Sequence, residues 1–226
     1  MKKLLVGLSV ASNALFVAAL AWLLIGGGRD RIVTHVLELN RERLVSLWDS
    51  FPIERSQVVF LGDSTTQLGR WSEFFPGFNV RNLGVAGDTT VDVLNRLHQV
   101  TRGQPAIVFL DIGSNDLGSG SPPTEIETRY AEILDRLAAE SPETQVYIQS
   151  ALPRTSKYER RVIDLNRRLY RLAEGRGLPY IDLYAAFVCD DGSICNEYSN
   201  DKIHLLGPGY VKWVELLRPY ITVYNN

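Results

Sequence analysis

From Pro52 onwards, short apolar runs alternate with longer stretches in which apolar residues recur every three or four positions. The short runs, which are typical of buried strands, cover residues 58–61, 79–83, 107–112, 146–149 and 180–183. The stretches with helical spacing cover residues 91–99, 124–140 and 158–174, with a last one near 210–217. This alternation predicts an α/β domain with a five-stranded parallel sheet that helices cover on both faces.

The N-terminal 28 residues have a different pattern. Two lysines, at positions 2 and 3, precede an apolar run without charge from residue 4 to residue 25. As a helix, this run would be about 33 Å long, enough to cross the hydrocarbon core of a bilayer. It predicts an uncleaved membrane anchor over residues 1–28. The alternative is a cleaved signal peptide with Ala19-Leu20-Ala21 as its cleavage site.

Both interpretations of this segment give the same compartment. Lys2 and Lys3 favour an N-terminus on the cytoplasmic side. We therefore expect a single-pass protein with an extracytoplasmic (periplasmic) domain, or a secreted protein if the segment is cleaved. Between residues 32 and 48, apolar positions recur at helical spacing among charged ones. This pattern predicts an amphipathic helical spacer over residues 29–54, followed by the main domain over residues 55–226.

Composition narrows the possible partners. The chain of 226 residues is 45% hydrophobic with a net charge of −2, which gives no basic field and argues against a nucleic-acid partner. Cys189 and Cys195 flank a turn-rich loop, so a disulfide and a pair of free thiols both remain open. Two cysteines at this spacing do not make a zinc site. We expect no metal and no cofactor.

Polar residues that could carry chemistry follow the predicted strands, where ligands of parallel sheets bind. Ser64 follows the first strand at a sharp Gly62-Asp63 turn, Gly87 follows the second, and Asn115 follows the third. A serine hydroxyl needs a base before it acts as a nucleophile. Of the three histidines, only His204 lies in a loop with a carboxylate, that of Asp201, three residues earlier.

These residues supply the parts that acyl transfer from an ester requires. Asp201 would orient and stabilise the imidazole of His204, which would take the proton of Ser64. The backbone N–H groups of Ser64 and Gly87 and the amide of Asn115 would bind the developing oxyanion. Each motif alone is ordinary for a turn or a helix cap. Their combination predicts catalytic residues Ser64, Asp201 and His204 with Gly87 and Asn115 as oxyanion donors.

The order of these blocks resembles that of the SGNH (GDSL-type) hydrolase superfamily over about residues 55–222. The resemblance rests on Gly62-Asp63-Ser64, Gly87, Gly113-x-Asn115-Asp116 and Asp201-x-x-His204. It implies a flavodoxin-like three-layer α/β/α sandwich and the same five site residues. Within the superfamily, the stretches around residues 87–97, 152–154 and 191–210 are most similar to platelet-activating-factor acetylhydrolase catalytic subunits, which implies a small acyl group.

The expected function is a serine esterase that hydrolyses short-chain, acetyl-type acyl esters through an acyl-enzyme. The alternatives are an acyltransferase that moves an acyl group to or from a cell-surface glycan, a lysophospholipase or thioesterase, and a binding module with a vestigial site. The expected partners are an acyl ester or an acylated glycan or lipid, and the membrane through the N-terminal helix. A homodimer stays open.

Three further residues receive separate interpretations. Arg154 follows the fourth strand and is a candidate for substrate binding, the alternative being a solvated loop charge. Asp63 is expected to tie the serine turn together by hydrogen bonds. Asp88 is expected to cap a helix.

Overall fold

The computed structural model describes residues 12–13, 15–23 and 27–222. The chain divides into two compact units, Met1–Arg43 and Leu44–Asn226. All of the candidate site residues lie in the second unit.

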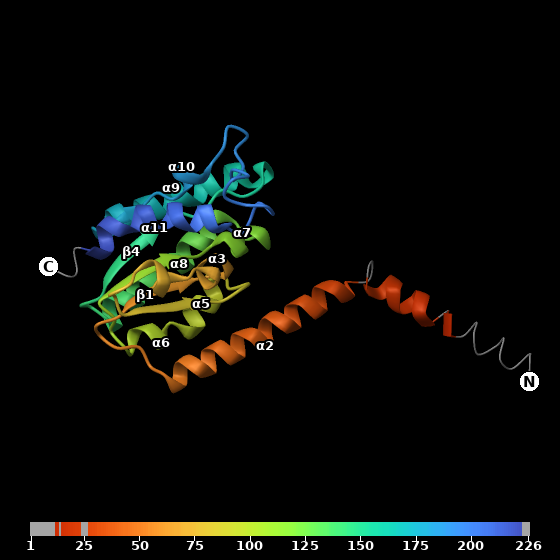
Figure 1. Ribbon diagram of the computed structural model, residues 1–226, viewed down its shortest axis with the longest axis horizontal. Coiled ribbons are helices and arrows are strands. Elements are labelled where there is room, and N and C mark those ends of the chain that lie inside the picture. The colour runs from red at the N-terminus through yellow and green to blue at the C-terminus, as the bar shows by residue number, and fades with distance from the viewer. Residues whose placement is uncertain (1–11, 14, 24–26, 223–226) are drawn as a thin grey trace, which may run out of the picture. The chain divides into compact units, whose positions relative to one another are not determined.

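Five parallel strands form the centre of the second unit (Figure 1). They are β1 (Val58–Gly62), β2 (Val80–Gly84), β3 (Ile107–Asp111), β4 (Gln145–Gln149) and β5 (Tyr180–Ile181), in the spatial order β2-β1-β3-β4-β5. The predicted α/β class with five parallel strands is confirmed, and the order is that of flavodoxin-like sheets. The expected strand over residues 180–183 is shorter than predicted, because the chain turns where the N–H of Leu183 bonds to the carbonyl of Ile181.

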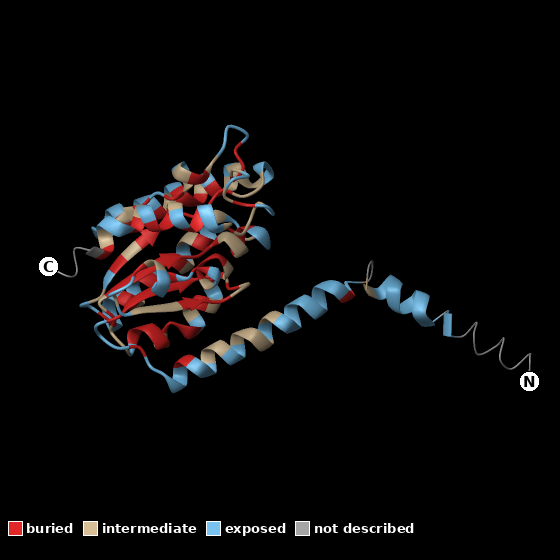
Figure 2. Cartoon of the chain, viewed as in Figure 1, coloured by how far each residue is buried: buried red, intermediate tan, exposed pale blue. Residues whose placement is uncertain are grey.

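Apolar side chains on both faces of the strands explain why helices cover the sheet twice. In β1, Val59 and Leu61 belong to one hydrophobic cluster, and Val58 and Phe60 belong to a second cluster on the opposite face. Each of these side chains is at most 1% exposed, and the strands are coloured as largely buried in Figure 2. β1 is therefore buried along its whole length rather than alternating between buried and exposed positions, as expected for a central strand of a parallel sheet that is covered on both faces.

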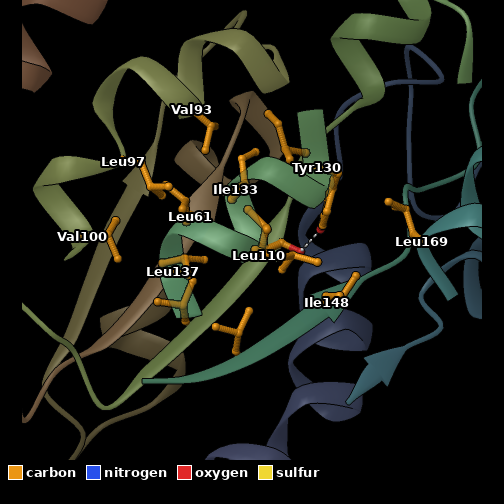
Figure 3. Packing of buried hydrophobic residues seen from close by; sticks show 14 of the residues in the cluster. Leu61, Val93, Leu97, Val100, Leu110, Tyr130, Ile133, Leu137, Ile148 and Leu169 are labelled. Carbon is orange, nitrogen blue, oxygen red and sulfur yellow. Dashed lines mark hydrogen bonds between the residues drawn. The ribbon is translucent and has the colours of Figure 1, made fainter. Parts of the chain in front are cut away.

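Different helices cover the two faces. The first cluster contains side chains of α5 (Thr90–Arg96), α6 (His98–Thr101), α7 (Ser114–Gly118), α8 (Pro123–Glu140) and α9 (Glu159–Arg176). The second contains side chains of α4 (Trp71–Phe74), α10 (Tyr184–Phe187) and α11 (Gly207–Thr222). Figure 3 shows part of the first cluster, where the hydroxyl of Tyr130 also donates to the carbonyl of Leu110 at 3.2 Å.

Two predicted helices differ in their bounds. The stretch expected as one helix over residues 91–99 forms two helices, α5 and α6, which are separated at Leu97. There the carbonyl of Leu97 accepts a hydrogen bond from the N–H of Val100, three residues later, as in a 3-10 turn. The last helix, expected near 210–217, runs from Gly207 to Thr222 and includes Pro219. Proline removes one backbone donor, but Trp213, Leu217 and Ile221 on either side of it are all buried. Packing of this apolar face therefore outweighs the local signal to stop.

The helix expected in the spacer is α2 (Gly28–Ser50). Its last part belongs to the second unit, where Trp48 is 7% exposed and joins the first hydrophobic cluster. The guanidinium of Arg96 lies over the Trp48 ring, and the side chain of Gln99 donates to the carbonyl of Val45. The C-terminal turns of α2 are thus part of the domain core.

Much of the predicted membrane segment, residues 4–25, lies outside the described residues. Residues 15–23 of it are helical. Within the part of the chain that the structure describes, no helix combines the length and the apolar character that a membrane crossing requires.

Candidate active site

The serine turn joins β1 to the short helix α3 (Ser64–Leu68). Asp63 caps this helix: its carboxylate accepts from the N–H of Thr65 at 3.0 Å and from the Thr65 hydroxyl at 2.8 Å. The expected structural role of Asp63 is confirmed. Because Ser64 is the first helical residue, its N–H has no partner within the helix. The turn thus fixes the hydroxyl of Ser64 at the carboxyl edge of the sheet.

A continuous chain of hydrogen bonds links Ser64, His204 and Asp201. The Oγ of Ser64 lies 3.0 Å from the Nε2 of His204, although 140 positions separate the two residues. The Nδ1 of His204 lies 2.7 Å from the Oδ2 of Asp201. The other carboxylate oxygen of Asp201 accepts from the backbone N–H groups of Ile203 and His204 at 2.8 and 2.7 Å. The three residues predicted from the sequence therefore meet.

The charge of Asp201 decides how the imidazole is oriented. Partial burial raises the pKa of Asp201, but the hydrogen bonds from the His204 ring and from the two backbone N–H groups outweigh it and lower the pKa to about 2. Asp201 is thus an anion at neutral pH and accepts a hydrogen from Nδ1 of His204. The lone pair of Nε2 then faces the Ser64 hydroxyl.

The loops after β2 and β3 are joined to each other and to α3. Gly87 has a φ of +83°, a conformation that favours glycine. Its neighbour Ala86 donates its N–H to the side chain of Gln67 on α3 at 2.7 Å. The side-chain amide of Asn115, on α7, donates to the carbonyl of Asp88 at 2.9 Å. The predicted oxyanion residues therefore lie on connected loops at the same edge as Ser64.

A buried ion pair between Arg96 and Asp88 holds these loops against the ends of the strands. Arg96 donates from Nε to the carboxylate of Asp88 at 2.7 Å, and the two side chains are 4% and 0% exposed. Arg96 also donates from Nη2 to the carbonyls of Gly62 and Leu83 at 3.1 and 2.9 Å. One guanidinium thus ties the ends of β1 and β2 to the loop that carries Gly87.

The expectation that Asp88 caps a helix is wrong. The cap of α5 is Thr89, which exchanges hydrogen bonds with Asp92 in a capping box. Asp88 pairs with Arg96 instead. The role of Arg96 was not inferred from the sequence, although its spacing from Val93 and Val100 places a cation on the apolar face of the predicted helix.

Two more buried carboxylates lie close to the site. Asp116 accepts from the N–H and hydroxyl of Thr90 at 3.0 and 2.6 Å and from Arg129 at 3.2 Å, which ties α7 to α5 and α8. Asp111, at the end of β3, lies 3.3 Å from the hydroxyl of Thr65, which also bonds to Asp63. Burial raises the pKa of Asp63, and burial together with repulsion from Asp63 raises the pKa of Asp111 well above its usual value.

Arg154 is not a solvated loop charge. Its guanidinium donates to the carbonyl and, at 3.3 Å, to the hydroxyl of Ser114, and it stacks on the ring of Tyr158 with 4.6 Å to the centroid. Burial lowers the pKa of Arg154. The side chain is therefore fixed beside Asn115, and its expected contact with substrate stays a prediction.

The two cysteines, Cys189 and Cys195, form a disulfide, which decides between the two alternatives that the sequence left open.

The other histidine in this unit, His98, is on α6, with its Nε2 3.8 Å from Asp49. Among the described residues, no group of three His, Cys, Asp or Glu side chains is arranged to hold a metal ion.

Comparison of the sequence with known proteins identifies one family. The profile of the GDSL-like lipase/acylhydrolase family matches residues 60–212. Platelet-activating factor acetylhydrolase IB subunit alpha1 of Bos taurus is 30% identical over 165 residues, which covers 68% of this chain and 70% of that protein.

Solved structures show the same fold. A GDSL-like lipase from Bacteroides thetaiotaomicron superposes with a TM-score of 0.69 at 23% identity, covering 81% of this chain and 97% of that chain. An acetyl xylan esterase superposes with a TM-score of 0.63 at 19% identity, covering 73% and 99%. At these identities the superpositions describe the fold alone. The profile match and the Bos taurus relative show that the chain belongs to the GDSL-like lipase/acylhydrolase family and is a carboxylic ester hydrolase.

Proposed function

We propose that the protein is a serine esterase that hydrolyses short-chain, acetyl-type acyl esters through a covalent acyl-enzyme. The observation that carries this proposal is the unbroken chain from Ser64 Oγ to His204 Nε2, at 3.0 Å, and from His204 Nδ1 to Asp201, at 2.7 Å. A hydroxyl, a base and an ionised orienting group at these distances form the arrangement that nucleophilic attack on an ester requires.

The residues divide the reaction between them. The Oγ of Ser64 attacks the carbonyl carbon of the ester while Nε2 of His204 takes the hydroxyl proton. The tetrahedral intermediate expels the alcohol, which receives that proton from His204. Water then attacks the acyl-enzyme while His204 takes its proton, and His204 returns that proton to the Oγ of Ser64 as the bond to the acyl carbon breaks and the carboxylic acid leaves. Throughout, the carboxylate of Asp201 stabilises the imidazolium that forms.

The oxyanion of each intermediate would be bound by three donors. The N–H of Ser64 is the first of α3, and the left-handed backbone at Gly87 lets its N–H approach closely. The side-chain nitrogen of Asn115 carries two hydrogens, one of which goes to the carbonyl of Asp88 at 2.9 Å, so the second can point at the substrate. Donors fixed in this way need no reorganisation during the reaction.

The identity of the acyl group rests on the sequence relatives. The Bos taurus protein, at 30% identity, is named as an acetylhydrolase, which supports a small acyl group here. The location rests on a separate observation. The disulfide between Cys189 and Cys195 supports a domain outside the cytoplasm, since disulfides persist in oxidising compartments. We propose an acylated glycan or lipid of that compartment as substrate.

Replacement of the nucleophile tests the chemistry. Ser64→Ala should lower turnover of p-nitrophenyl acetate by several orders of magnitude and abolish covalent labelling by a fluorophosphonate probe. Ser72→Ala, which changes an exposed serine on α4, is the matched control and should retain activity and labelling. Near-normal turnover by folded Ser64→Ala would refute the proposal.

A series of p-nitrophenyl esters of increasing acyl length tests the specificity. We expect kcat/KM to be highest for acetate and to fall with each added methylene pair. A maximum at long chains would instead indicate a lipase or thioesterase.

Thiol labelling tests the location. Intact cells are quenched in acid, which preserves the redox state of the cysteines, and the protein is then treated with a thiol reagent. Neither cysteine should react. Full labelling of both thiols would contradict an oxidising compartment.

A further inference from the structure

The segment that carries Asp201 and His204 has no helix or strand of its own. Residues 201–204 form a series of bends before α11, and the side chain of Asp201 is 46% exposed. Lys202 within it has a φ of +65°. A lysine in the left-handed region is unfavourable and persists only where its surroundings hold it there. Besides the hydrogen bonds that Asp201 accepts from Ile203 and His204, contacts from neighbouring segments can stabilise this conformation.

The neighbouring loop is well suited to do so. The disulfide between Cys189 and Cys195 closes residues 189–195, here called the disulfide loop. Inside it, the N–H of Cys189 bonds to the carbonyl of Ser193 at 2.8 Å, and Val188, just before the loop, pairs with Ile194 in an antiparallel bridge. Ser193 and Ile194 are 3% and 0% exposed. The two ends of the disulfide loop are thus joined by several bonds, and its Ile194 side chain is buried in the core.

The ammonium of Lys202 connects the two segments. It donates to the carbonyl of Ile194 at 2.7 Å and to the hydroxyl of Ser193 at 3.2 Å. The same hydroxyl donates to the carboxylate of Asp191 at 2.7 Å. Both acceptors of the Lys202 ammonium thus belong to the disulfide loop, whereas the backbone N–H groups that donate to Asp201 belong to residues 203 and 204. Lys202 therefore contributes an attachment.

A second path joins the same two segments. The carbonyl of Cys195 accepts from the N–H groups of Tyr198 and Ser199 at 3.0 and 3.1 Å. Ser199 is fully buried, and its hydroxyl donates to the carboxylate of Asp201 at 3.3 Å. Both paths begin in the disulfide loop and end on the segment that places His204.

We propose that Lys202 is a positioning residue: held by Ser193 and Ile194 of the disulfide loop, it keeps the Asp201–His204 segment in the conformation in which the imidazole reaches Ser64. This inference rests on the proposed function, in which His204 is the base. It adds that closure of the disulfide loop by Cys189 and Cys195 is a requirement for full activity, because the loop carries both attachment points.

Lys202→Met tests the attachment directly, since it keeps an unbranched side chain, one heavy atom shorter, and removes the ammonium with its three donors. We expect kcat for p-nitrophenyl acetate to fall by about 10- to 100-fold, the loss that a small misplacement of a catalytic group causes, with little change in KM. The downfield NMR resonance of the His204 Nδ1 proton should weaken or shift. Lys202→Arg, which keeps a cation that can reach the Ile194 carbonyl, should recover most of kcat. Lys212→Met, on α11, is the control and should match the wild type.

A double-mutant cycle tests the link to the disulfide. The joint variant Cys189→Ser/Cys195→Ser should lose at least as much kcat as Lys202→Met does, because opening the loop weakens both attachments. Adding Lys202→Met to it should cost little more, since the attachment of Lys202 is already lost. Losses that multiply would overturn the proposal. So would equal kcat for Lys202→Met and Lys202→Arg, a comparison that decides the question even if the cysteine variant does not fold.

The outcome is separable from that of the proposed function. If Ser64→Ala is inactive and folded Lys202→Met retains wild-type kcat and an unchanged His204 resonance, only the positioning role of Lys202 fails. If Ser64→Ala retains activity, the serine mechanism itself fails, whatever Lys202→Met does.

Discussion

The two sides of the candidate active site are held in place by different means. The side with Ser64 and Asn115 follows strands of the sheet and rests on buried charged groups such as the pair of Asp88 and Arg96, 0% and 4% exposed. The side with Asp201 and His204 is a surface segment whose side chains are 46% and 39% exposed. One side is therefore part of the buried core, and the other lies at the surface and is attached to it by a few contacts. We expect changes on the exposed side to affect activity alone and changes on the buried side to affect stability as well.

The largest effect is expected on the exposed side. Asp201→Asn keeps the oxygen that accepts from Ile203 and His204 but places an amide N–H opposite Nδ1 of His204, which favours the wrong imidazole tautomer. By analogy with other serine hydrolases, kcat should fall about 10⁴-fold. The free energy of unfolding at pH 7 should change by about 1 kcal/mol or less, because the pair is exposed. Steady-state kinetics and urea unfolding measure the two quantities.

The acid side of the stability profile is the control for this variant. The pKa of Asp201 is lowered to about 2 in the folded protein, so its contribution to stability is present above pH 4 and is lost as pH falls from about 4 to about 2. Asp201→Asn should remove that part of the acid dependence. A large loss of stability at pH 7 would contradict the view that this segment is attached to a core that folds without it.

The next effect is expected on the buried side. Arg96→Met leaves the carboxylate of Asp88 without its buried partner and should lower the free energy of unfolding by about 3–5 kcal/mol. Because Arg96 also bonds to the carbonyls of Gly62 and Leu83, activity at low temperature should fall as well. Urea unfolding and p-nitrophenyl acetate hydrolysis at 10–20 °C, the range in which domains are usually most stable, test both expectations.

Arg176→Met is the matched control, since it breaks a surface pair with Asp135 at 2.8 Å. It should cost about 1 kcal/mol or less and leave kcat unchanged. If Arg96→Met were no more costly than Arg176→Met, the buried scaffold would not be what holds the nucleophile side.

A smaller effect is expected for Asn115, the proposed oxyanion donor whose side chain joins the two loops. Asn115→Ala removes the side-chain amide and its bond to the carbonyl of Asp88, and kcat should fall about 10²- to 10³-fold. Ser119→Ala, at the end of the same helix, should match the wild type. A normal kcat for Asn115→Ala would exclude its side chain as an oxyanion donor.

The sequence predicted the residues that meet at the candidate site better than the residues that support them. Ser64 was found because it follows a strand, at the edge where ligands of parallel sheets bind, and His204 because a carboxylate stands three residues before it in a loop. Arg96 and Asp116 could not be assigned in this way, because each is a common residue type in a helix. Their roles depend on burial and on partners far away in the chain, such as Gly62 for Arg96.

Local signals also failed where packing overrides them. Asp88 stands where a cap would be expected, but Thr89 takes that role because Asp88 is drawn inward by Arg96. Pro219 would normally end a helix, and α11 continues through it. The pairing of Cys189 with Cys195 was undecided in the sequence, since spacing alone does not show whether two loop cysteines approach each other.

The smallest effect concerns the pH dependence of stability. We expect Asp111, on the buried side, and Asp201, on the exposed side, to change the free energy of unfolding in opposite directions as pH rises. One hydroxyl, that of Thr65, lies within hydrogen-bonding distance of both Asp63 and Asp111. A hydroxyl has one hydrogen, so it can donate to Asp63 and accept from Asp111 only if Asp111 carries a proton. Burial and repulsion from Asp63, which raise the pKa of Asp111 well above its usual value, favour that proton too.

A retained proton lowers stability as pH rises. Asp111 of the unfolded chain ionises near pH 4, whereas the folded protein holds its proton to a higher pH, so the free energy of unfolding falls from about pH 4 upward, until the raised pKa is passed. Asp111→Asn should abolish this fall, gaining about 1.4 kcal/mol for each unit by which the pKa was raised. The titratable groups whose charges interact with that of Asp111 are Asp63, Tyr130 and Tyr210.

Urea unfolding of wild type and Asp111→Asn at pH 5 and pH 8 measures this difference, with the surface variant Asp164→Asn as the control. An equal loss for Asp111→Asn at both pH values would mean that Asp111 is ionised and that its charge stabilises the fold. A gain in the free energy of unfolding that grows with pH would show that the buried carboxyl of Asp111 stays neutral next to the Ser64 turn. The exposed carboxylate of Asp201 on the other side of the site stays charged. The two aspartates would then affect the pH profile in opposite directions, because one is desolvated and the other is surrounded by hydrogen-bond donors.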